Sequence, residues 1–320
     1  MGPRALSAAA AVAPGYTVRP ARADDAPAVA GLWLACDLHD FGTPAADEQE
    51  VHEEWDHPGF DLERDTWLVL DPEGGMAAYA QVSDHGDALE AFALVHPEQR
   101  GRGLGAAALA FTERRATAGR PAGVALRHIT TGVDERAKDL LLKAGYSPIR
   151  HFWHMEGELS LPYPDPPAPP DGFDVRTFVP GEDGPILYRI VEASFARHWG
   201  WVAEPYDSWK RRLDRPTFDP SLTFFATHGL QEIGALIADE RIGMGWVTTL
   251  GVLEEWRGRG LGELLLRHAF AAFARRGWTR TGLSVDSSNE TGATRLYERV
   301  GMRVVRQFDA YRRVLEPIRP

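Results

Sequence analysis

The sequence contains a single cysteine, Cys36, among its 320 residues. One cysteine excludes an intrachain disulfide and is typical of a reducing compartment, so we expect a cytoplasmic protein in which Cys36 is a buried thiol. Basic residues are also scarce, since 35 Lys and Arg stand against 46 Asp and Glu, a net charge of −11. This balance argues against nucleic acid as a partner, because phosphate-backbone binding requires a basic face.

Long apolar runs and clusters of metal ligands are absent too. No stretch approaches the roughly 18 apolar residues of a membrane-spanning helix, so we expect no membrane partner. The opening stretch MGPRALSAAAAVAPG is too short and weakly apolar for a signal peptide, and we expect residues 1–14 to form a disordered tail. His151 and His154 stand three apart, which directs their side chains to opposite faces of a strand, so we expect no metal site.

Prolines gather in one segment. The stretch LPYPDPPAPPDG holds six prolines in twelve residues. Such a density excludes a helix or a central strand. We therefore interpret residues 161–171 as a stiff, extended linker.

The two sides of this linker are similar in sequence. Shifting the second half back by 157 residues (175 − 18) places Val175 on Val18, and the same shift superimposes the glycine-rich stretches RGRGLG of both halves. Near-gapless agreement of this kind indicates a duplication. We expect an N-terminal domain over residues 15–160 and a C-terminal domain over residues 172–320, and the apolar fraction of 44% provides material for two cores.

Each half shows the same order of expected elements. An opening strand and a helical region precede three strands, the glycine stretch, a helix, another strand, another helix and two closing strands. In the second half the strands are expected over 173–178, 222–227, 233–239, 246–252, 281–286, 302–308 and 311–315, and the helices over 183–195, 261–276 and 291–301. This alternation predicts a fold of the α/β (α+β) class.

The glycine stretch is the most informative motif. Glycines let the chain turn from a strand into a helix with its amides uncovered, and the first helical amides have no internal partner and carry the positive end of the dipole. Together they form an anion site suited to a diphosphate, to which the arginines can add charge-assisted contacts. The predicted phosphate-binding residues are Arg257, Gly258, Arg259, Gly260, Leu261 and Gly262, with Arg100, Gly101, Arg102, Gly103, Leu104 and Gly105 in the first half.

Two other phosphate-binding motifs are disfavoured. No Gly-Lys-Ser/Thr follows, which excludes a Walker loop. The sequence GRGLGA, which begins at Gly101, fits the dinucleotide-binding motif loosely. Asp286 could mimic the acidic residue that binds the ribose in such sites. A dinucleotide oxidoreductase places this motif after the first strand, however, whereas about four strands precede it here, and Glu263 replaces the third small residue.

Arg-x-x-Gly-x-Gly after a fourth strand resembles motif A of the GNAT superfamily, the Gcn5-related N-acetyltransferases. The later stretch NETGATRLYERVGM, residues 289–302, resembles motif B of the same superfamily. The resemblance covers about residues 16–314 as a tandem pair, similar to the mycothiol-synthase-like group. It implies two GNAT domains, each a mixed, mostly antiparallel sheet flanked by helices, and it implies acetyl-CoA as the acyl donor.

The resemblance also implies roles for residues of the second half. Leu250, Gly251 and Val252 should pair their backbone with the pantetheine arm of acetyl-CoA, and Leu94 and Val95 occupy that strand in the first half. Asn289 should contact the arm, and Tyr297 should lie beside the sulfur. Eight residues separate Asn289 from Tyr297, a little over two helical turns, so both can face one cleft. A phenol there can supply a proton or a hydrogen bond to a departing thiolate.

The two halves are not equivalent. When Gly145 is aligned with Gly301, Val133 replaces Asn289 and Leu141 replaces Tyr297. Neither replacement carries a side-chain donor. We expect catalysis in the C-terminal domain, and an N-terminal domain that binds acetyl-CoA structurally or not at all.

The general base and the acceptor are less well defined by the sequence. Many members of the superfamily carry a Glu on the fourth strand, but here that strand reads GMGWVTTLGV and has no carboxylate. Asp239, Glu240 and Glu254 are candidates through water. His198, Trp199 and Trp246 are candidate substrate residues, with His198 as a base of suitable pKa, although an aromatic lid without a catalytic role is an equal alternative.

These observations favour one function and leave another open. The favoured function is acetyl transfer from acetyl-CoA to a primary amine of a small molecule, by direct attack of the amine on the thioester, in a monomer or homodimer. The alternative is an acyl-CoA-binding sensor or regulatory protein without turnover, suggested by the degenerate first copy and the missing base. Asn289 and Tyr297 favour the enzyme.

Overall fold

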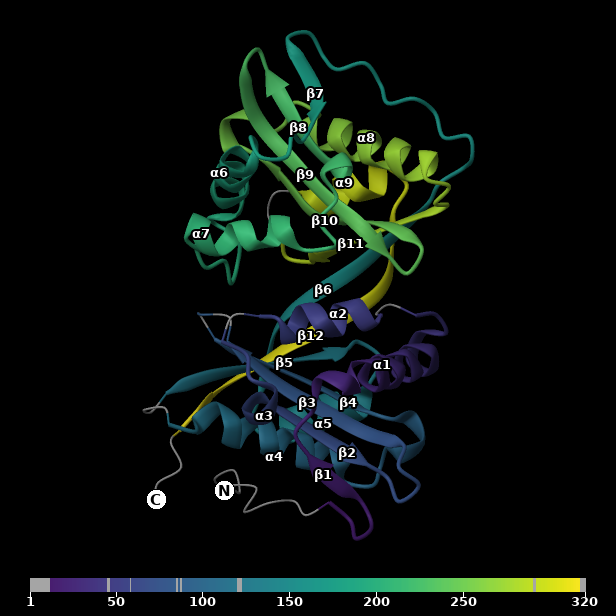
Figure 1. The fold of residues 1–320 in the computed structure, drawn as a ribbon, viewed down its shortest axis with the longest axis vertical. Coiled ribbons are helices and arrows are strands. Elements are labelled where there is room, and N and C mark those ends of the chain that lie inside the picture. The colour runs from purple at the N-terminus through teal and green to yellow at the C-terminus, as the bar shows by residue number, and fades with distance from the viewer. Residues whose placement is uncertain are drawn as a thin grey trace. The chain divides into compact units, whose positions relative to one another are not determined.

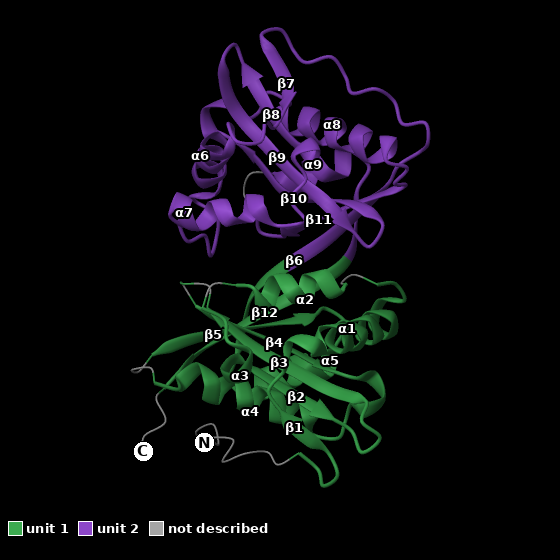
Figure 2. Cartoon of the chain, in the orientation of Figure 1, with its two compact units in different colours: residues 1–151, 306–320 green, residues 152–305 purple. Residues whose placement is uncertain are grey.

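A computed structural model describes residues 12–44, 47–57, 59–84, 86, 88–119, 123–289 and 292–316 of the chain. The tail expected over residues 1–14 lies outside this part except for its last three residues. The structure divides into two compact units (Figure 2). Unit 1 comprises residues 1–151 and 306–320, and unit 2 comprises residues 152–305.

Apart from the additional short helix α3 in the first half, the helices and strands follow one another in the same order in both halves of the chain (Figure 1). The first half contains β1 (Thr17–Arg19), α1 (Ala26–Phe41), α2 (Glu48–Trp55), α3 (Leu62–Asp65), β2 (Thr66–Leu70), β3 (Met76–Asp84), β4 (Leu89–Val95), α4 (Leu104–Thr117), β5 (Val124–Thr131), α5 (Glu135–Lys143) and β6 (Ser147–Glu158). The second contains β7 (Phe173–Thr177), α6 (Gly184–Phe195), α7 (Tyr206–Trp209), β8 (Thr223–His228), β9 (Gln231–Arg241), β10 (Met244–Val252), α8 (Leu261–Arg275), β11 (Arg280–Asp286), α9 (Ala293–Arg299) and β12 (Arg303–Leu315). The two closing strands expected over 302–308 and 311–315 form the single strand β12.

The sheets are mixed and mostly antiparallel, as predicted. In unit 1 the strand order is β1-β2-β3-β4-β5-β12, and in unit 2 it is β7-β8-β9-β10-β11-β6. One neighbouring pair in each unit is parallel, β4 with β5 and β10 with β11, and the other neighbouring pairs within each unit are antiparallel over the described residues. The parallel pair follows from the helix that crosses over between its strands, α4 or α8.

The last strand of each unit comes from the other half of the chain. Residues 308–315 of β12 pair with β5 of unit 1, and residues 152–158 of β6 pair with β11 of unit 2. The units therefore differ from the division expected from the sequence, which placed β6 with residues 15–160 and β12 with residues 172–320. A strand of 12 residues extends about 40 Å, long enough to leave one unit and enter the other, and its alternating pattern does not specify which sheet it joins.

Two apolar cores hold unit 2 together, one on each face of its sheet, beneath the helices α8 and α6 that Figure 1 shows on opposite sides of the sheet. Helix α8 buries Leu265 and Phe273 on one face, and helix α6 buries Leu187 and Ile190 on the other. Packing is close enough that Gly245 of β10 cannot carry a side chain, because a Cβ there would lie 2.2 Å from the Phe273 ring. The sheet is therefore a fixed platform for the chemistry at its edge.

Cys36 is buried in unit 1, as predicted, and burial raises the pKa of its thiol to about 11. Within the described ranges, no helix combines the length and apolar character needed to cross a bilayer.

Candidate active site

The candidate active site of unit 2 begins where β10 and β11 stop pairing. Their parallel register runs only from Gly245 opposite Thr281 to Val247 opposite Leu283. Beyond this point β10 continues to Val252 and keeps its antiparallel pairing with β9. A bulge at Thr248 shifts the register with β9 and increases the local twist. The edge of β10 over residues 248–252 is thereby open toward β11.

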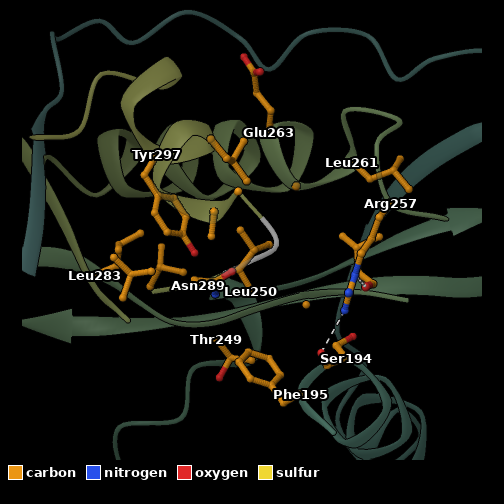
Figure 3. A pocket seen from close by; sticks show the side chains of 18 of the residues that line it. Ser194, Phe195, Thr249, Leu250, Arg257, Leu261, Glu263, Leu283, Asn289 and Tyr297 are labelled. Carbon is orange, nitrogen blue, oxygen red and sulfur yellow. Dashed lines mark hydrogen bonds between the residues drawn. The ribbon is translucent and has the colours of Figure 1, made fainter. Parts of the chain in front are cut away.

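A cavity of about 370 Å³ lies between the two strands where they separate (Figure 3). Residues of α6, β10, the loop before α8, α8 itself, β11 and α9 line it. Figure 3 shows Arg257 and Leu261 at one end, and Tyr297 and Leu283 at the other. Of the predicted site residues of unit 2, the cavity is lined by Leu250, Gly251, Val252, Arg257, Gly258, Gly260, Leu261, Gly262, Asn289, Tyr297 and His198.

The N-terminus of α8 opens into this cavity. Gly258 and Gly260 adopt φ values of 75° and 78°, in the left-handed region that side chains disfavour, and Gly260 is the N-cap of the 15-residue helix. No heavy atom outside the adjoining chain lies within 4 Å of where a Cβ would stand at either glycine. The first amides of α8 are therefore uncovered and can receive an anion.

The two arginines of the loop have partners within the protein. Arg257 donates from Nε to the Val252 carbonyl at 3.0 Å and from Nη2 to the Ser194 carbonyl at 3.1 Å. Its guanidinium thus ties the loop to β10 and α6, although it also lines the cavity. Arg259 does not line the cavity, and its guanidinium lies 5.0 Å from the Trp256 ring centroid. In this structure the backbone of the loop faces the cavity more directly than its cations do.

Glu263 occupies the position where a dinucleotide motif has a small residue. Its carboxylate lies in the first turn of α8 and contacts Arg267 at 3.0 Å and Arg299 at 3.7 Å. Figure 3 shows the side chain pointing away from the centre of the cavity. The two arginines compensate a negative charge that would otherwise oppose an anion at the mouth of α8.

Tyr297 lies at the far end of the cavity, on α9. Its side chain is 8% exposed, and its hydroxyl points into the cavity toward Asn289 and Leu250 (Figure 3). Among the described residues the hydroxyl has no hydrogen-bond partner. Burial raises the pKa of Tyr297 to about 12, so the phenol stays protonated at physiological pH and is available as a donor.

His198 is the only imidazole among the described residues that line the cavity. Burial and the nearby Arg257 guanidinium lower the pKa of His198, so the ring is neutral near pH 7. The other two candidate substrate residues lie elsewhere in unit 2. Trp199 is 39% exposed and packs on Phe152, and Trp246 packs on Gly282.

The carboxylates considered as bases do not line the cavity either. Asp239 pairs with Arg241 at 3.3 Å, and Glu240 accepts a hydrogen bond from the Gly243 amide. Glu254 pairs with Arg197 on the surface. These three residues therefore stabilise turns and the surface of unit 2 rather than its cavity.

The other residues that line the cavity were not predicted from the sequence as site residues, namely Ser194, Phe195, Val247, Thr248, Thr249, Trp256, Leu283, Ser284, Val285, Gly292, Ala293, Leu296 and Arg299. Ser194 was detectable in principle, because the shift of 157 residues places it on Asp37, a polar residue that lines the corresponding cavity of unit 1. The bulge at Thr248 has no comparable signal, since it changes the register without changing the composition of the strand.

Unit 1 contains a smaller cavity, of about 210 Å³, between β4 and β5. Leu94, Val95, Arg100, Gly101 and Gly105 line it, whereas Arg102, Gly103 and Leu104 do not. Arg100 is held by Asp40 in a bidentate pair at 2.8 and 3.0 Å.

The chemistry of this second cavity differs from that of unit 2. The last parallel pair of unit 1 is Ala91 with His128, in place of Val247 with Leu283. His128 contacts the Thr112 hydroxyl at 3.2 Å, and burial lowers the pKa of His128 to about 3. Leu141 is buried where α9 has Tyr297, and Val133 is exposed. The guanidinium of Arg136 approaches Gly101, 3.8 Å from where a Cβ would stand.

Comparison with known proteins identifies the class. The sequence profile of the Acetyltransferase (GNAT) family matches residues 29–146 and 187–302. The chain belongs to this family and carries two copies of its domain in tandem. It is an N-acetyltransferase by this relationship.

The relatives found in sequence and in structure agree. The mycothiol acetyltransferase of Kineococcus radiotolerans is 36% identical over 244 residues, 73% of this chain and 77% of that protein. The mycothiol acetyltransferase of Streptomyces griseus is 33% identical over 245 residues, 73% and 75% of the two chains. A GCN5-related N-acetyltransferase from Sphaerobacter thermophilus has a TM-score of 0.81 at 34% identity and covers 96% of this chain and 98% of its own. A tandem GNAT protein from the clavulanic acid biosynthesis pathway has a TM-score of 0.72 at 17% identity, over 95% and 100% of the two chains, and shares the fold.

Proposed function

We propose that unit 2 transfers the acetyl group of acetyl-CoA to a primary amine of a small molecule. The proposal rests on one observation. The uncovered amides of α8, the open edge of β10 and the hydroxyl of Tyr297 line a single cavity, in that order along its length (Figure 3). A diphosphate, an extended arm with amide groups and a thioester require these features in the same order.

The residues present fit acetyl-CoA. The amides of residues 258–262 receive the diphosphate, and the positive end of the α8 dipole favours its charge. The backbone of Leu250, Gly251 and Val252 pairs with the amides of the pantetheine arm as a neighbouring strand would. Asn289 contributes a side-chain amide beside the arm.

The chemistry follows from the groups at the far end. The neutral amine attacks the carbonyl carbon, a C–N bond forms, and the C–S bond breaks. Backbone amides at the bulge near Thr248 stabilise the negative charge that grows on the thioester oxygen. The hydroxyl of Tyr297 donates to the departing sulfur. Because the pKa of Tyr297 is about 12, hydrogen-bond donation stabilises the thiolate more than full proton transfer does.

His198 is the proposed acceptor for the proton that the amine loses. The lowered pKa keeps the imidazole neutral, as a base requires. It acts through water, since its ring lies close to Arg257, a residue that Figure 3 shows at the opposite end of the cavity from Tyr297. Unit 1 has no counterpart of Tyr297 and is proposed to carry out no acetyl transfer.

Only the names of the relatives indicate which class of amine to test first as the acetyl acceptor. Two of them are named mycothiol acetyltransferases, which makes an amino sugar bearing a thiol the first acceptor to test. Aminoglycosides, polyamines and peptide amines complete the panel. Strand β10 carries no carboxylate, unlike many members of the superfamily, so the deprotonation step is the feature in which this enzyme departs from them.

The test has two stages. Calorimetry with acetyl-CoA, CoA and NADH is expected to give binding of the first two only. The full chain is then incubated with acetyl-CoA and each amine, and the acetylated product is followed by mass spectrometry, because a thiol-bearing acceptor interferes with reagents that detect released CoA. Failure to bind acetyl-CoA contradicts the proposal, and so does binding without product for every amine.

A further inference from the structure

The closed end of the unit 2 cavity is formed by two aliphatic side chains. Val247 of β10 and Leu283 of β11 are the last residues to pair before the strands separate. Both line the cavity, and they are only 4% and 2% exposed. The space between the separating strands β10 and β11, called the wedge below, therefore ends at Val247 and Leu283.

The geometry determines which part of a bound thioester reaches this wedge. The diphosphate site is at the N-terminus of α8, near Val252. Val252 lies five residues after Val247, a length of about 17 Å along the strand. An arm that pairs with the open edge of β10 runs from the α8 end toward Val247, so its acyl group is the part nearest the pair.

The side chains of Val247 and Leu283 cannot easily move aside for a longer acyl group. Val247 and Leu283 belong to the same buried core cluster as Met155 and Phe273. Protein interiors are close-packed, and side chains in them move aside only at a cost in strain. Tyr297 packs in the same cluster and borders the wedge from α9. The space beyond a two-carbon acyl group is occupied by protein on each of these sides.

We propose that Val247 and Leu283 set the acyl-chain length of the donor, admitting acetyl and excluding longer acyl groups. The proposal rests on the function proposed above, because it assumes a thioester in this cavity. It concerns the donor and not the amine. The cavity of unit 1 does not end on such a pair, since the last parallel pair there is Ala91 with His128 and Ala91 does not line the cavity.

Equilibrium binding tests this without knowledge of the amine. Dissociation constants of acetyl-, propionyl- and butyryl-CoA are measured by calorimetry for the full chain and for Leu283→Ala. Differences of one methylene in an apolar pocket change discrimination by about tenfold or more. The wild type is expected to bind butyryl-CoA at least about tenfold more weakly than acetyl-CoA, and Leu283→Ala is expected to bring the two within about threefold.

The matched control is Val285→Ala. Val285 lines the cavity from the same face of β11, two residues nearer the α8 end, and is 6% exposed. The Val285→Ala substitution shortens an aliphatic side chain in the same core. It is nevertheless expected to keep the wild-type ratio of the dissociation constants of butyryl-CoA and acetyl-CoA. Leu283→Val, with a smaller cavity, gives an intermediate ratio and serves if Leu283→Ala does not fold, as judged by circular dichroism.

The outcomes separate this inference from the proposed function. If no acyl-CoA binds, the proposed function is wrong and this inference falls with it. If all three bind equally to the wild type, or if Val285→Ala changes the ratio as much as Leu283→Ala does, only the inference about chain length is overturned.

Discussion

Tyr297 is the residue whose chemistry most depends on its surroundings. The phenol is buried, has no partner among the described residues and faces the end of the cavity where a thioester is proposed to lie. A donor in that position acts on the departing sulfur and contributes little to the ground state, where the sulfur is a weak acceptor.

Tyr297→Phe is therefore expected to lower kcat about 10²-fold and to leave the dissociation constant of acetyl-CoA unchanged. Tyr146→Phe, a buried tyrosine of unit 1, is the control and should keep full activity. The measurement is steady-state kinetics combined with calorimetry. An unchanged kcat in Tyr297→Phe excludes the tyrosine from the reaction. The pKa of about 12 also predicts no loss of activity from this group up to about pH 10.

If His198 is the base, the pH profile of the activity should have an acidic limb that is set by the pKa of His198. A base must be unprotonated, so activity falls as the pH drops through the pKa of His198, which lies below the usual value of 6.5. His198→Gln should lower kcat/KM and abolish this limb. His268→Gln is the matched control, because burial on α8 also lowers the pKa of His268 but its side chain is not among those that line the cavity. A limb that survives in His198→Gln assigns the base to another group.

The buried imidazole of His128 should make the folding stability of unit 1 sensitive to acid. Its pKa is about 3 in the folded state and about 6.5 when unfolded, so below pH 6.5 the unfolded chain takes up a proton that the folded chain does not. The imidazole therefore costs stability as the pH falls, about 2 kcal/mol between pH 7 and pH 5. His128→Leu, which replaces the imidazole with an aliphatic side chain, is expected to remove this difference. Hydrogen exchange of the β5 amides at both pH values measures it, and equal pH dependence in the two proteins contradicts the prediction.

At the scale of elements, helix α8 combines two requirements at opposite ends. Its N-terminus must stay uncovered for the anion binding proposed above, whereas its C-terminal end is followed by the left-handed Gly277 (φ 81°), for which no ligand is proposed. The same backbone conformation is therefore proposed to serve ligand binding at Gly260 and the fold alone at Gly277.

Gly260→Ala and Gly277→Ala separate these roles. A left-handed alanine costs about 1–2 kcal/mol at either site, so both variants should lose a similar amount of thermal stability. Only Gly260→Ala is expected to weaken acetyl-CoA binding, by about tenfold, because it turns the amides at the mouth of α8. Thermal unfolding and calorimetry give the two quantities. Equal binding by both variants contradicts the assignment of the diphosphate to α8.

The elements also show what the sequence could and could not predict. The repeated glycine stretch predicted the mouth of α8, because glycine is required wherever φ is near 75°, a local property. The partners of Arg257 were not predictable, since the Ser194 carbonyl is 63 residues away in the chain. The bulge at Thr248 and the wedge at Val247 and Leu283 arise from pairing between strands, which composition does not encode.

At the scale of the whole molecule, the exchange of β6 and β12 joins the two copies of the domain. Residues 152–158 complete the sheet of unit 2, and residues 308–315 complete the sheet of unit 1. Tyr311 and Leu315 belong to a buried core cluster of unit 1 together with Leu126 and Leu141. A cut at the proline-rich linker, residues 161–171, therefore leaves each half without its last strand.

Truncation tests this organisation. A chain that stops after Val305 retains unit 2 complete and removes β12 from unit 1, so unit 1 should unfold at a lower temperature while acetyl-CoA binding by unit 2 persists. A fragment of residues 147–305 is expected to fold, whereas a fragment of residues 161–320 should be less stable although it is about as long. Calorimetric unfolding of the three proteins checks this. A linker-cut half that unfolds at the wild-type temperature contradicts it.

The exchange of strands also bears on how the chain is made and inherited. Unit 2 is a continuous segment, residues 152–305, whereas unit 1 needs residues that leave the ribosome after all of unit 2 has emerged. The copy that is translated first is thus the one that completes its folding last. Neither copy can be deleted from the gene without removing a strand from the other, which gives selection a reason to retain the N-terminal copy, although it has Leu141 where the C-terminal copy has Tyr297.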